Sequence, residues 1–261
     1  MGKMIFEWDY EIIDAHCHPF EKAENNLAVY GAPETLDGMT HELKKVGIDR
    51  ACGSFIIRNN ACNWEDIRYA NDQVMSYAER SGGFYIPGIH VHGAYVEESC
   101  AELAAMHKRG VRWVGELVPY IMGTENLNSP GNMQILEAIR DLDMAVNLHW
   151  GSPEEIADVA EAFPTLKLIL AHPGEIWESK GRFEALDKYK NVCLDFSGTG
   201  LFRWNLLRWS IDRFGAERVL FGTDFPICSA GLNLYGALCE NISHDEAELF
   251  FSGNFKRLTG L

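Results

Sequence analysis

The chain has no long hydrophobic segment. Among its 261 residues no apolar run approaches the roughly 18 residues that a membrane-spanning helix needs. The first ten residues carry acidic side chains and no extended apolar stretch, so we expect no signal peptide. Hydrophobic residues make up 47% of the chain and charged residues 23%, which is typical of globular proteins. The sequence therefore predicts a soluble protein that does not insert into a membrane.

Positive charge is scarce. The chain has 23 Lys and Arg residues against 38 Asp and Glu residues, which gives a net charge of -15. Nucleic acids and anionic membranes bind positively charged surfaces, so this balance argues against both as main partners. It does not restrict a small-molecule substrate, because a bound metal ion can reverse the field inside an acidic protein. We expect a small-molecule partner, and the sequence leaves open whether the chain forms a homo-oligomer.

The seven cysteines form no C-x-x-C pair, and their number is odd. A disulfide framework would require pairs at regular spacing, so the pattern favours free thiols and a reducing cytoplasm. The chain also lacks an internal repeat, a low-complexity segment and a composition that marks a linker. We therefore expect one domain over residues 1–261.

Eight short apolar runs are spread along the chain and resemble strands buried on both faces. They are Ile12–His16, Ala51–Ile57, Phe84–His90, Val111–Leu117, Met144–His149, Leu166–Ala171, Val192–Phe196 and Val219–Gly222. Longer segments with helical patterns separate them, and strands that alternate with helices predict a parallel sheet. No G-x-G-x-x-G motif follows the first run, where a dinucleotide-binding open sheet would place it. The sequence therefore predicts the α/β class and a single (β/α)8 TIM barrel.

The segments with helical patterns often end just before a glycine, a residue that favours a helix C-terminus. They are Pro33–Val46, Glu65–Arg80, Glu97–Arg109, Asn132–Leu142, Pro153–Ala162, Trp177–Tyr189 and Asn205–Phe214, with further helix expected in His244–Leu261. The longest loops are predicted at Pro19–Ala32 and Phe225–Leu232. Both follow strands, on the face where barrels carry their active sites.

Histidines and acids gather at the ends of the predicted strands. His16 and His18 are two residues apart, so both imidazoles can point to the same side of a strand and reach one ion. The other candidates at strand ends are Glu116, His149, His172 and Asp224. A single histidine at a strand end is usually structural, but six such residues on one rim of a barrel predict a metal centre.

The motifs at these strand ends resemble those of the amidohydrolase superfamily, and most closely its amidohydrolase-related branch, also called "amidohydrolase 2". The similar segments are Asp14–His18, His149, Ala171–Gly174 and Gly222–Pro226. The resemblance implies a (β/α)8 barrel in a family of mostly hydrolases with a group of non-oxidative decarboxylases. It implies that His16, His18, His149 and Asp224 bind metal. It also implies that His172 is either a ligand of a second metal or a catalytic histidine.

Glu116 departs from the carboxylated lysine that many two-metal members carry at the end of the fourth strand. In this respect the chain resembles TatD-type hydrolases, in which a glutamate can bridge two ions. The alternative is that Glu116 is an acid that contacts the ligands or the substrate around a single ion. We expect one or two divalent ions, most simply Zn²⁺, because imidazoles and carboxylates suit it.

Asp224 is the expected general base. A divalent ion lowers the pKa of its bound water from about 16 towards 7, and a nearby carboxylate can accept the proton of that water. His172 would then polarise a substrate oxygen or complete a second metal site.

Four further residues at the same rim are candidates for substrate contacts, and each has an ordinary structural alternative. They are Arg58, His92, Tyr120 and Trp150. Arg58 could bind a carboxylate through its planar guanidinium or could form a surface ion pair. His92 could contact the substrate or be a solvated loop residue, and the two aromatic side chains could line the pocket or simply pack.

The sequence thus predicts a metal-dependent hydrolase that uses metal-activated water on a small ester, lactone, amide or phosphoester. The alternative is a metal-dependent non-oxidative decarboxylase of a small (aromatic) carboxylic acid. A non-catalytic metal-binding barrel is disfavoured, because the ligands and a candidate base are all present. The substrate follows only by analogy, since this fold supports many reactions.

Overall fold

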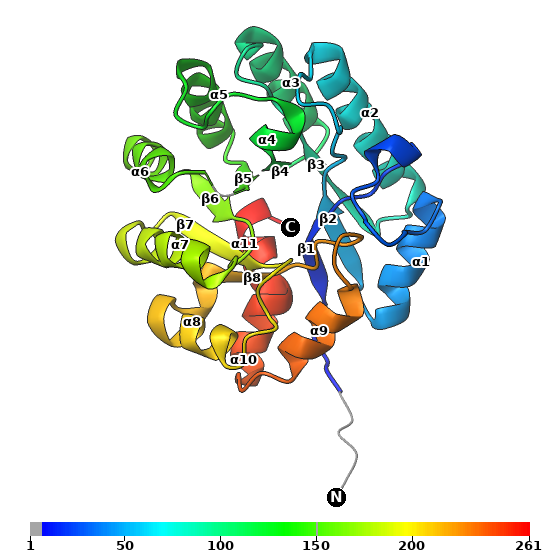
Figure 1. Ribbon diagram of the computed structural model, residues 1–261, viewed down its shortest axis with the longest axis vertical. Helices are drawn as coiled ribbons and strands as arrows, with labels where there is room; N and C mark the ends of the chain where they lie inside the picture. The colour runs from blue at the N-terminus through cyan, green and yellow to red at the C-terminus, as the bar shows by residue number, and fades with distance from the viewer. Residues whose placement is uncertain (1–6, 150) are drawn as a thin grey trace, which may run out of the picture.

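Eight parallel strands form one sheet in which each strand pairs with its neighbours in chain order (Figure 1). They are β1 (Ile13–Cys17), β2 (Arg50–Gly53), β3 (Tyr85–Ile89), β4 (Trp113–Leu117), β5 (Ala145–Leu148), β6 (Lys167–Leu170), β7 (Val192–Phe196) and β8 (Val219–Phe221). The sheet closes on itself because Cys17 of β1 forms a bridge with Phe225, just after β8. The His18 N–H also donates to the Phe225 carbonyl at 2.8 Å. We call this junction between β1 and the end of β8 the seam. The fold is therefore the predicted (β/α)8 barrel.

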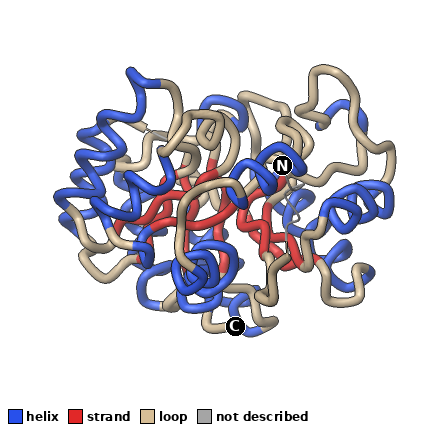
Figure 2. The backbone as a smooth tube through the Cα atoms, turned by 90° about the horizontal axis from the view of Figure 1, so that it is seen from below, coloured by secondary structure: helices blue, strands red, loops and turns tan. Residues whose placement is uncertain are grey.

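The computed structural model describes residues 7–149 and 151–261. Helices surround the strands, which occupy the centre of the molecule in both views (Figures 1 and 2). They are α1 (Leu36–Val46), α2 (Trp64–Arg80), α3 (Val96–Lys108), α4 (Pro119–Met122), α5 (Pro130–Asp141), α6 (Pro153–Ala162), α7 (Ile176–Lys188), α8 (Leu206–Phe214), α9 (Ala230–Leu238), α10 (His244–Glu248) and α11 (Asn254–Thr259). None of the described helices is both long and apolar enough to span a membrane.

Apolar side chains fill the interior of the barrel below the rim. This inner cluster consists of Ile13, Ala15, Cys52, Trp113, Ala145, Ile169, Cys193, Leu220, Phe255 and Leu258. Phe255 and Leu258 come from α11, and the Phe255 ring lies 5.1 Å from the Trp113 ring between centroids. The last helix therefore closes the end of the barrel at which the strands begin, and the opposite end is left for polar groups.

Local sequence explains the helix ends that were predicted most accurately. Helix α6 begins as expected, because the Ser152 hydroxyl accepts a hydrogen bond from the Glu155 N–H and Pro153 occupies the first turn. Helix α1 ends at Gly47, whose φ of 106° is easy only for glycine.

Three elements differ from the prediction. The expected strand Ala51–Ile57 is shorter, because β2 ends at Gly53 and the apolar residues after it continue as a buried loop. Helix α9 begins inside the segment Phe225–Leu232, which was predicted as a loop. The short helix α4 was not predicted at all. Each difference lies on the rim beyond a strand, where loops rather than regular periodicity determine the backbone.

Candidate metal centre

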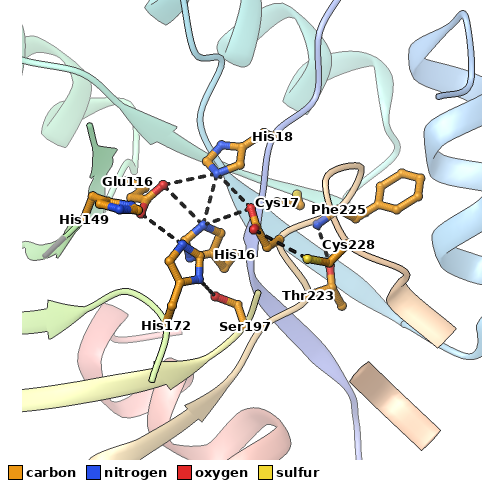
Figure 3. A network of polar contacts seen from close by, with 12 residues as sticks. His16, Cys17, His18, Glu116, His149, His172, Ser197, Thr223, Phe225 and Cys228 are labelled. Atoms are coloured by element: carbon orange, nitrogen blue, oxygen red, sulfur yellow. Dashed lines mark hydrogen bonds and ion pairs between the residues drawn. The ribbon is translucent and has the colours of Figure 1, made fainter. Parts of the chain in front are cut away.

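Four ligand atoms from three parts of the chain meet at the rim of the barrel (Figure 3). The Nε2 atoms of His16 and His18 lie 3.0 Å apart. Glu116 Oε2 lies 3.4 Å from His16 Nε2 and 3.3 Å from His18 Nε2. Asp224 Oδ1 lies 3.8 Å and 3.5 Å from the same two nitrogens. We call these four residues the primary cluster.

The other ring nitrogens of the two histidines are bound to acceptors. His16 Nδ1 lies 3.0 Å from Asp195 Oδ2, and His18 Nδ1 lies 3.3 Å from the Ser54 carbonyl oxygen. Both Nδ1 atoms therefore act as donors, and the Nε2 lone pairs are directed at each other. Two such lone pairs at 3.0 Å need a cation between them, either a proton or a metal ion.

The primary cluster has the chemistry and spacing of a divalent-ion site. Donor atoms bound to one ion at about 2.1 Å lie roughly 3.0–3.4 Å from one another, close to the separations observed here. Asp224 Oδ1 is buried, and no hydrogen-bond partner for it lies in the described part of the chain. A buried carboxylate oxygen of this kind is expected to face a cation. Two imidazoles and two carboxylates suit Zn²⁺ and Mn²⁺ equally well.

The charges of the cluster are strongly coupled. Burial alone would lower the pKa of His16, but the Asp195 and Glu116 carboxylates outweigh it and raise that pKa well above its usual value. Burial would raise the pKa of Glu116, but His16 and the other histidines hold it well below its usual value. A metal ion that binds here therefore has to displace a proton from His16.

Glu116 also faces a second group of histidines through its other oxygen. Glu116 Oε1 lies 2.8 Å from His149 Nδ1 and 3.5 Å from His172 Nε2. His172 Nδ1 is held by Ser197 Oγ at 2.9 Å. Glu116 thus lies between the primary cluster and the pair His149 and His172, which is the arrangement that a bridging carboxylate requires (Figure 3).

The structure assigns His149 a different place from the one that the sequence predicted. The prediction grouped His149 with His16, His18 and Asp224. In the structure Glu116 lies beside those three residues, and His149 contacts the far oxygen of Glu116. His149 is also the more exposed, with 26% of its side chain accessible against 4% for Glu116.

Two irregular strands direct the ligands. The register of β1 against β2 shifts between Asp14 and Cys17, and that of β4 against β5 shifts between Val114 and Leu117. Ala15 and Trp113 point into the barrel, so strict alternation would turn His16 and Glu116 outwards. An irregularity of this kind lets consecutive residues face the same side. The primary cluster exists because both strands break their alternation at the rim.

Asp195 is the residue that sequence reasoning missed. Its Oδ2 contacts His16 Nδ1 and accepts a hydrogen bond from Asn147 Nδ2 at 2.7 Å, and its Oδ1 accepts from the His172 N–H at 3.2 Å. Burial would raise its pKa, but His16, His172 and Ser197 lower it to about 2. Asp195 therefore remains charged and orients both histidines. Its position in the predicted strand Val192–Phe196, among apolar neighbours, was the available signal.

Two of the candidate residues, Asp224 and His172, share an unusual backbone conformation. Asp224 and His172 adopt φ values of 61° and 58°, in the left-handed region that non-glycine residues rarely occupy. The Asp224 N–H donates to the His16 carbonyl at 2.8 Å, so the seam between β8 and β1 holds this conformation. Such conformations are concentrated at functional sites, which supports a role for both residues.

A cavity of about 350 Å³ opens onto the primary cluster and onto His149 and His172. Its polar lining includes His18, Glu116, His149, His172, Arg182 and Asp224. Its apolar lining consists of Leu27, Val118, Ile121 and Ile227, and Glu175 and Glu178 also line it. Arg182 of α7 is buried and its Nη1 lies 3.8 Å from Glu178 Oε2, so the cavity combines the primary cluster, a buried guanidinium and apolar side chains.

The four predicted substrate-contact residues have different surroundings. Tyr120 lines the cavity, and its ring lies 5.1 Å from that of His149. Arg58 lines a neighbouring hollow that shares Tyr120 with the cavity, and its Nη1 donates to the Asn26 carbonyl. His92 is buried away from the cavity, and its Nδ1 accepts a hydrogen bond from the Ala94 N–H at 3.1 Å. Trp150 lies outside the described residues.

Solved structures share the fold over nearly the whole chain. A 2,6-dihydroxybenzoate decarboxylase from Rhizobium has a TM-score of 0.75 at 16% identity, with 97% of this chain and 99% of that chain covered. A 5-carboxyvanillate decarboxylase from Novosphingobium aromaticivorans, solved with manganese and a nitrobenzoic acid ligand, has a TM-score of 0.73 at 14% identity, with 97% and 96% covered. A probable 2-pyrone-4,6-dicarboxylic acid hydrolase from Acinetobacter baumannii has a TM-score of 0.67 at 15% identity, with 96% and 100% covered. At these identities the likeness shows the fold alone.

A curated relative and a family model match the sequence. An uncharacterized protein of Sinorhizobium fredii is 29% identical over 105 residues, which span 34% of this chain and about a third (35%) of that protein. The model of the family described as "Amidohydrolase" matches residues 13–261, from the first residue of β1 to the end of the chain. The matched segment contains the whole primary cluster as well as His149 and His172. The chain belongs to this amidohydrolase family.

Proposed function

We propose that this protein is a metal-dependent, non-oxidative decarboxylase of a small aromatic carboxylic acid. The observation that carries the proposal is the cavity itself. It brings together the primary cluster, the buried Arg182 and four apolar side chains around a volume of about 350 Å³. A planar ring fits against the apolar side chains, while its anionic groups require positive charge in the same cavity.

The relatives support this reaction more than the hydrolysis that the sequence predicted. Two of the three structures described above are decarboxylases of hydroxylated benzoic acids, and one of these holds manganese. For this reason we propose Mn²⁺ as well as Zn²⁺ as the ion. His16, His18, Glu116 Oε2 and Asp224 Oδ1 would hold it, and the ion would supply a positive charge that orients and polarises the oxygens of the substrate.

The side chains of the chain itself can carry the proton that decarboxylation consumes. The ring carbon that bears the carboxylate gains a proton, the bond to the carboxylate breaks, its electron pair returns to the ring, and carbon dioxide leaves. We assign the proton transfer to Asp224 Oδ2, with His172 as the group that replaces the proton. The side chains of Asp224 and His172 both border Gly198. A Cβ atom built on this glycine would lie 3.1 Å from Asp224 Oδ2 and 2.5 Å from His172 Nδ1.

His172 is suited to hold that proton. Burial alone would lower the pKa of His172, but the Glu116 and Asp224 carboxylates outweigh it and raise the pKa above its usual value. The protonated imidazole is held in place by Ser197 at Nδ1 and faces Glu116 at Nε2. Arg182 lines the same cavity and could bind a carboxylate or an ionised hydroxyl of the substrate.

Hydrolysis is the second candidate, and the position of Glu116 favours it. One oxygen of Glu116 faces His16 and His18, and the other faces His149 and His172. Glu116 could therefore bridge two ions, the second of which His149 and His172 would also bind. Two ions held by these residues would supply positive charge for both the attacking and the leaving oxygen. In this case Asp224 would act as the general base towards a water molecule, and the substrate would be an ester, lactone, amide or phosphoester.

Product analysis distinguishes the two reactions. The protein, loaded in turn with Mn²⁺ and Zn²⁺, is incubated with a panel of hydroxybenzoic acids in D₂O and, separately, with a panel of esters and lactones in H₂¹⁸O. We expect carbon dioxide release from a hydroxybenzoic acid, with one deuterium at the carbon that bore the carboxylate. Cleavage of an ester or lactone with ¹⁸O in the product, and no carbon dioxide from any acid, would overturn the proposal.

A matched pair of variants ties the activity to the site. Arg182→Leu should raise KM for the acid, and Arg213→Leu should leave it unchanged, because Arg213 lies on the surface of α8 and pairs with Asp187. Equal effects of the two substitutions would remove Arg182 from substrate binding.

A further inference from the structure

A second cavity, of about 320 Å³, lies at the end of the barrel opposite the metal centre. It opens where β6, β7 and β8 begin, and α11 borders it. Its lining consists of Thr165, Leu166, Lys167, Lys190, Asn191, Cys193, Phe214, Glu217, Arg218, Arg257 and Leu258. None of these residues contributes to the cavity at the metal centre.

Positive charge is concentrated in this second cavity. Four of its lining residues are basic and one, Glu217, is acidic, so the lining carries a net charge of +3. The chain as a whole carries -15, so the cavity is a positive region in a strongly negative molecule. A cavity of one sign concentrates ligands of the opposite sign, and its low-dielectric walls strengthen the effect.

The two arginines are held in place without being neutralised. Arg218 is buried, and its Nε and Nη2 donate to the carbonyls of Val192 at 2.6 Å and Tyr189 at 2.7 Å. Arg257 Nη2 donates to the Glu217 carbonyl at 2.7 Å. Carbonyl oxygens fix the direction of a guanidinium but leave its full charge to act on a ligand.

Of the four basic residues, one is paired with a carboxylate and three are not paired within the described part of the chain. Lys167 pairs with Asp143 at 2.8 Å, but within residues 7–149 and 151–261 no carboxylate lies at ion-pair distance from Lys190, Arg218 or Arg257. Cys193 lines the cavity and is also part of the inner cluster of the barrel. Burial raises the pKa of its thiol despite the neighbouring Arg218 and Arg257, so the thiol stays neutral.

We propose that this second cavity binds a phosphate group, either as free phosphate or as the phosphate of a small monoester. Two fixed guanidinium groups and an ammonium group match the charge and the several acceptor oxygens of a phosphate dianion. The volume is roughly ten times the ~30 Å³ share of one water molecule, which leaves room for an organic substituent. The bound phosphate would connect β6, β7 and β8 to α11, and thereby stabilise β7, which contains Asp195, and the strands that lead to His172 and Asp224.

The test measures binding of inorganic phosphate by calorimetry and by the thermal unfolding temperature. All solutions have the same ionic strength, adjusted with sodium chloride, and the protein is first stripped of metal so that phosphate cannot bind at the metal centre. We expect saturable binding by the metal-free protein and a rise in unfolding temperature with phosphate concentration. Lys190→Gln and Arg257→Gln should each weaken binding about five-fold or more, because each removes one full charge beside the ligand.

Lys188→Gln is the matched control. Lys188 lies two residues from Lys190, pairs with Glu161 at the surface and does not line the cavity, so binding should be unchanged. Three results would each overturn the proposal. They are equal weakening in Lys188→Gln, unchanged binding in Lys190→Gln and Arg257→Gln, and no binding by the metal-free protein. A sugar phosphate measured in parallel distinguishes the two sources: tighter binding than inorganic phosphate identifies a monoester site, and weaker binding identifies a site for free phosphate.

Discussion

At the scale of single residues, the sequence predicts which side chains gather at the rim but not how they pair. His16, His18 and Asp224 lie together because each ends or follows a strand of one closed barrel. The sequence could not predict that Glu116, and not His149, lies beside these three residues, because this depends on the shifted register of β4. Asp195 was missed because its partners come from β1, β5 and the loop after β6, which are distant in the sequence.

The first prediction follows from this exchange. His16→Ala should remove the ion from the primary cluster, because it removes one of the four donor atoms and leaves the charge of Asp195 without its histidine partner. His149→Ala should leave that ion bound, since the contact of His149 with the primary cluster is to Glu116 Oε1, whereas Oε2 faces His16 and His18. Metal per chain, measured by elemental analysis after reconstitution, checks both. Loss of all metal in His149→Ala would return His149 to the primary cluster.

The second prediction concerns Asp224. Asp224→Asn keeps the size of the side chain but cannot transfer a proton, so turnover should fall by about 10²-fold or more. The reduction should appear in kcat for variants whose metal content is confirmed. Asp212→Asn, at an exposed position of α8, is the control and should leave kcat unchanged. A kcat near that of the unmodified enzyme in metal-loaded Asp224→Asn would exclude the role.

At the scale of elements, periodicity predicts strands and helices well where they pack against the core and poorly at the rim. All eight strands were found, because apolar runs between amphipathic helices have few other interpretations. The apolar residues after Gly53 were assigned to the same strand because burial in a loop gives the same composition as burial in a strand. Helix α9 buries one face, but its exposed positions include the apolar Leu232 and Tyr235, so its sequence lacks the contrast between a polar and an apolar face.

Helix α10 gives a prediction that depends on pH. Glu246 forms two hydrogen bonds with Arg208, at 2.7 and 2.9 Å, and also accepts from the Ser243 N–H that begins the helix. Arg208 and Ser243 lower the pKa of Glu246 from 4.5 to about 2. Since the folded-state pKa is the lower one, the stabilisation is complete above about pH 4.5 and is lost as the pH falls towards 2.

Glu246→Gln should therefore lower the free energy of unfolding by about 1–2 kcal/mol at pH 7, after allowance for the partial exposure of the pair. Urea denaturation between pH 7 and pH 3 measures the difference from the unmodified protein, which should shrink as the pH falls. A difference that stays constant over this range would show that the stabilisation does not come from the charge of Glu246.

Helix α11 gives a prediction about the closed end of the barrel. Phe255 is 2% exposed and packs on Trp113 inside the barrel. Phe255→Ala should lower the free energy of unfolding by about 3–5 kcal/mol, because it leaves a cavity that the rigid strands cannot fill. Phe255→Leu is the control, and its cost should be smaller. Equal, small costs in both variants would mean that α11 does not close the core.

At the scale of the whole molecule, function and closure of the barrel depend on the same seam. The primary cluster takes ligands from β1, β4 and the loop after β8, so a bound ion connects the first and last strands directly. Only two described backbone contacts of the seam involve residues beyond Asp224, the bridge from Cys17 to Phe225 and the hydrogen bond of His18 with the same residue. An ion at the rim would therefore add a further link between the first and last strands at this seam.

Removal of the metal should for this reason destabilise the whole barrel as well as abolish activity. An ion present at 100 times its dissociation constant stabilises the folded state by about 2.7 kcal/mol, which corresponds to roughly 5–10 °C in a chain of this size. We expect thermal unfolding to shift down by that amount after chelation and to recover when Mn²⁺ or Zn²⁺ is restored. In Asp224→Asn, which has a weaker ligand at the seam, chelation should produce a smaller shift. An unfolding temperature that is independent of metal in the unmodified protein would show that the ion does not support closure.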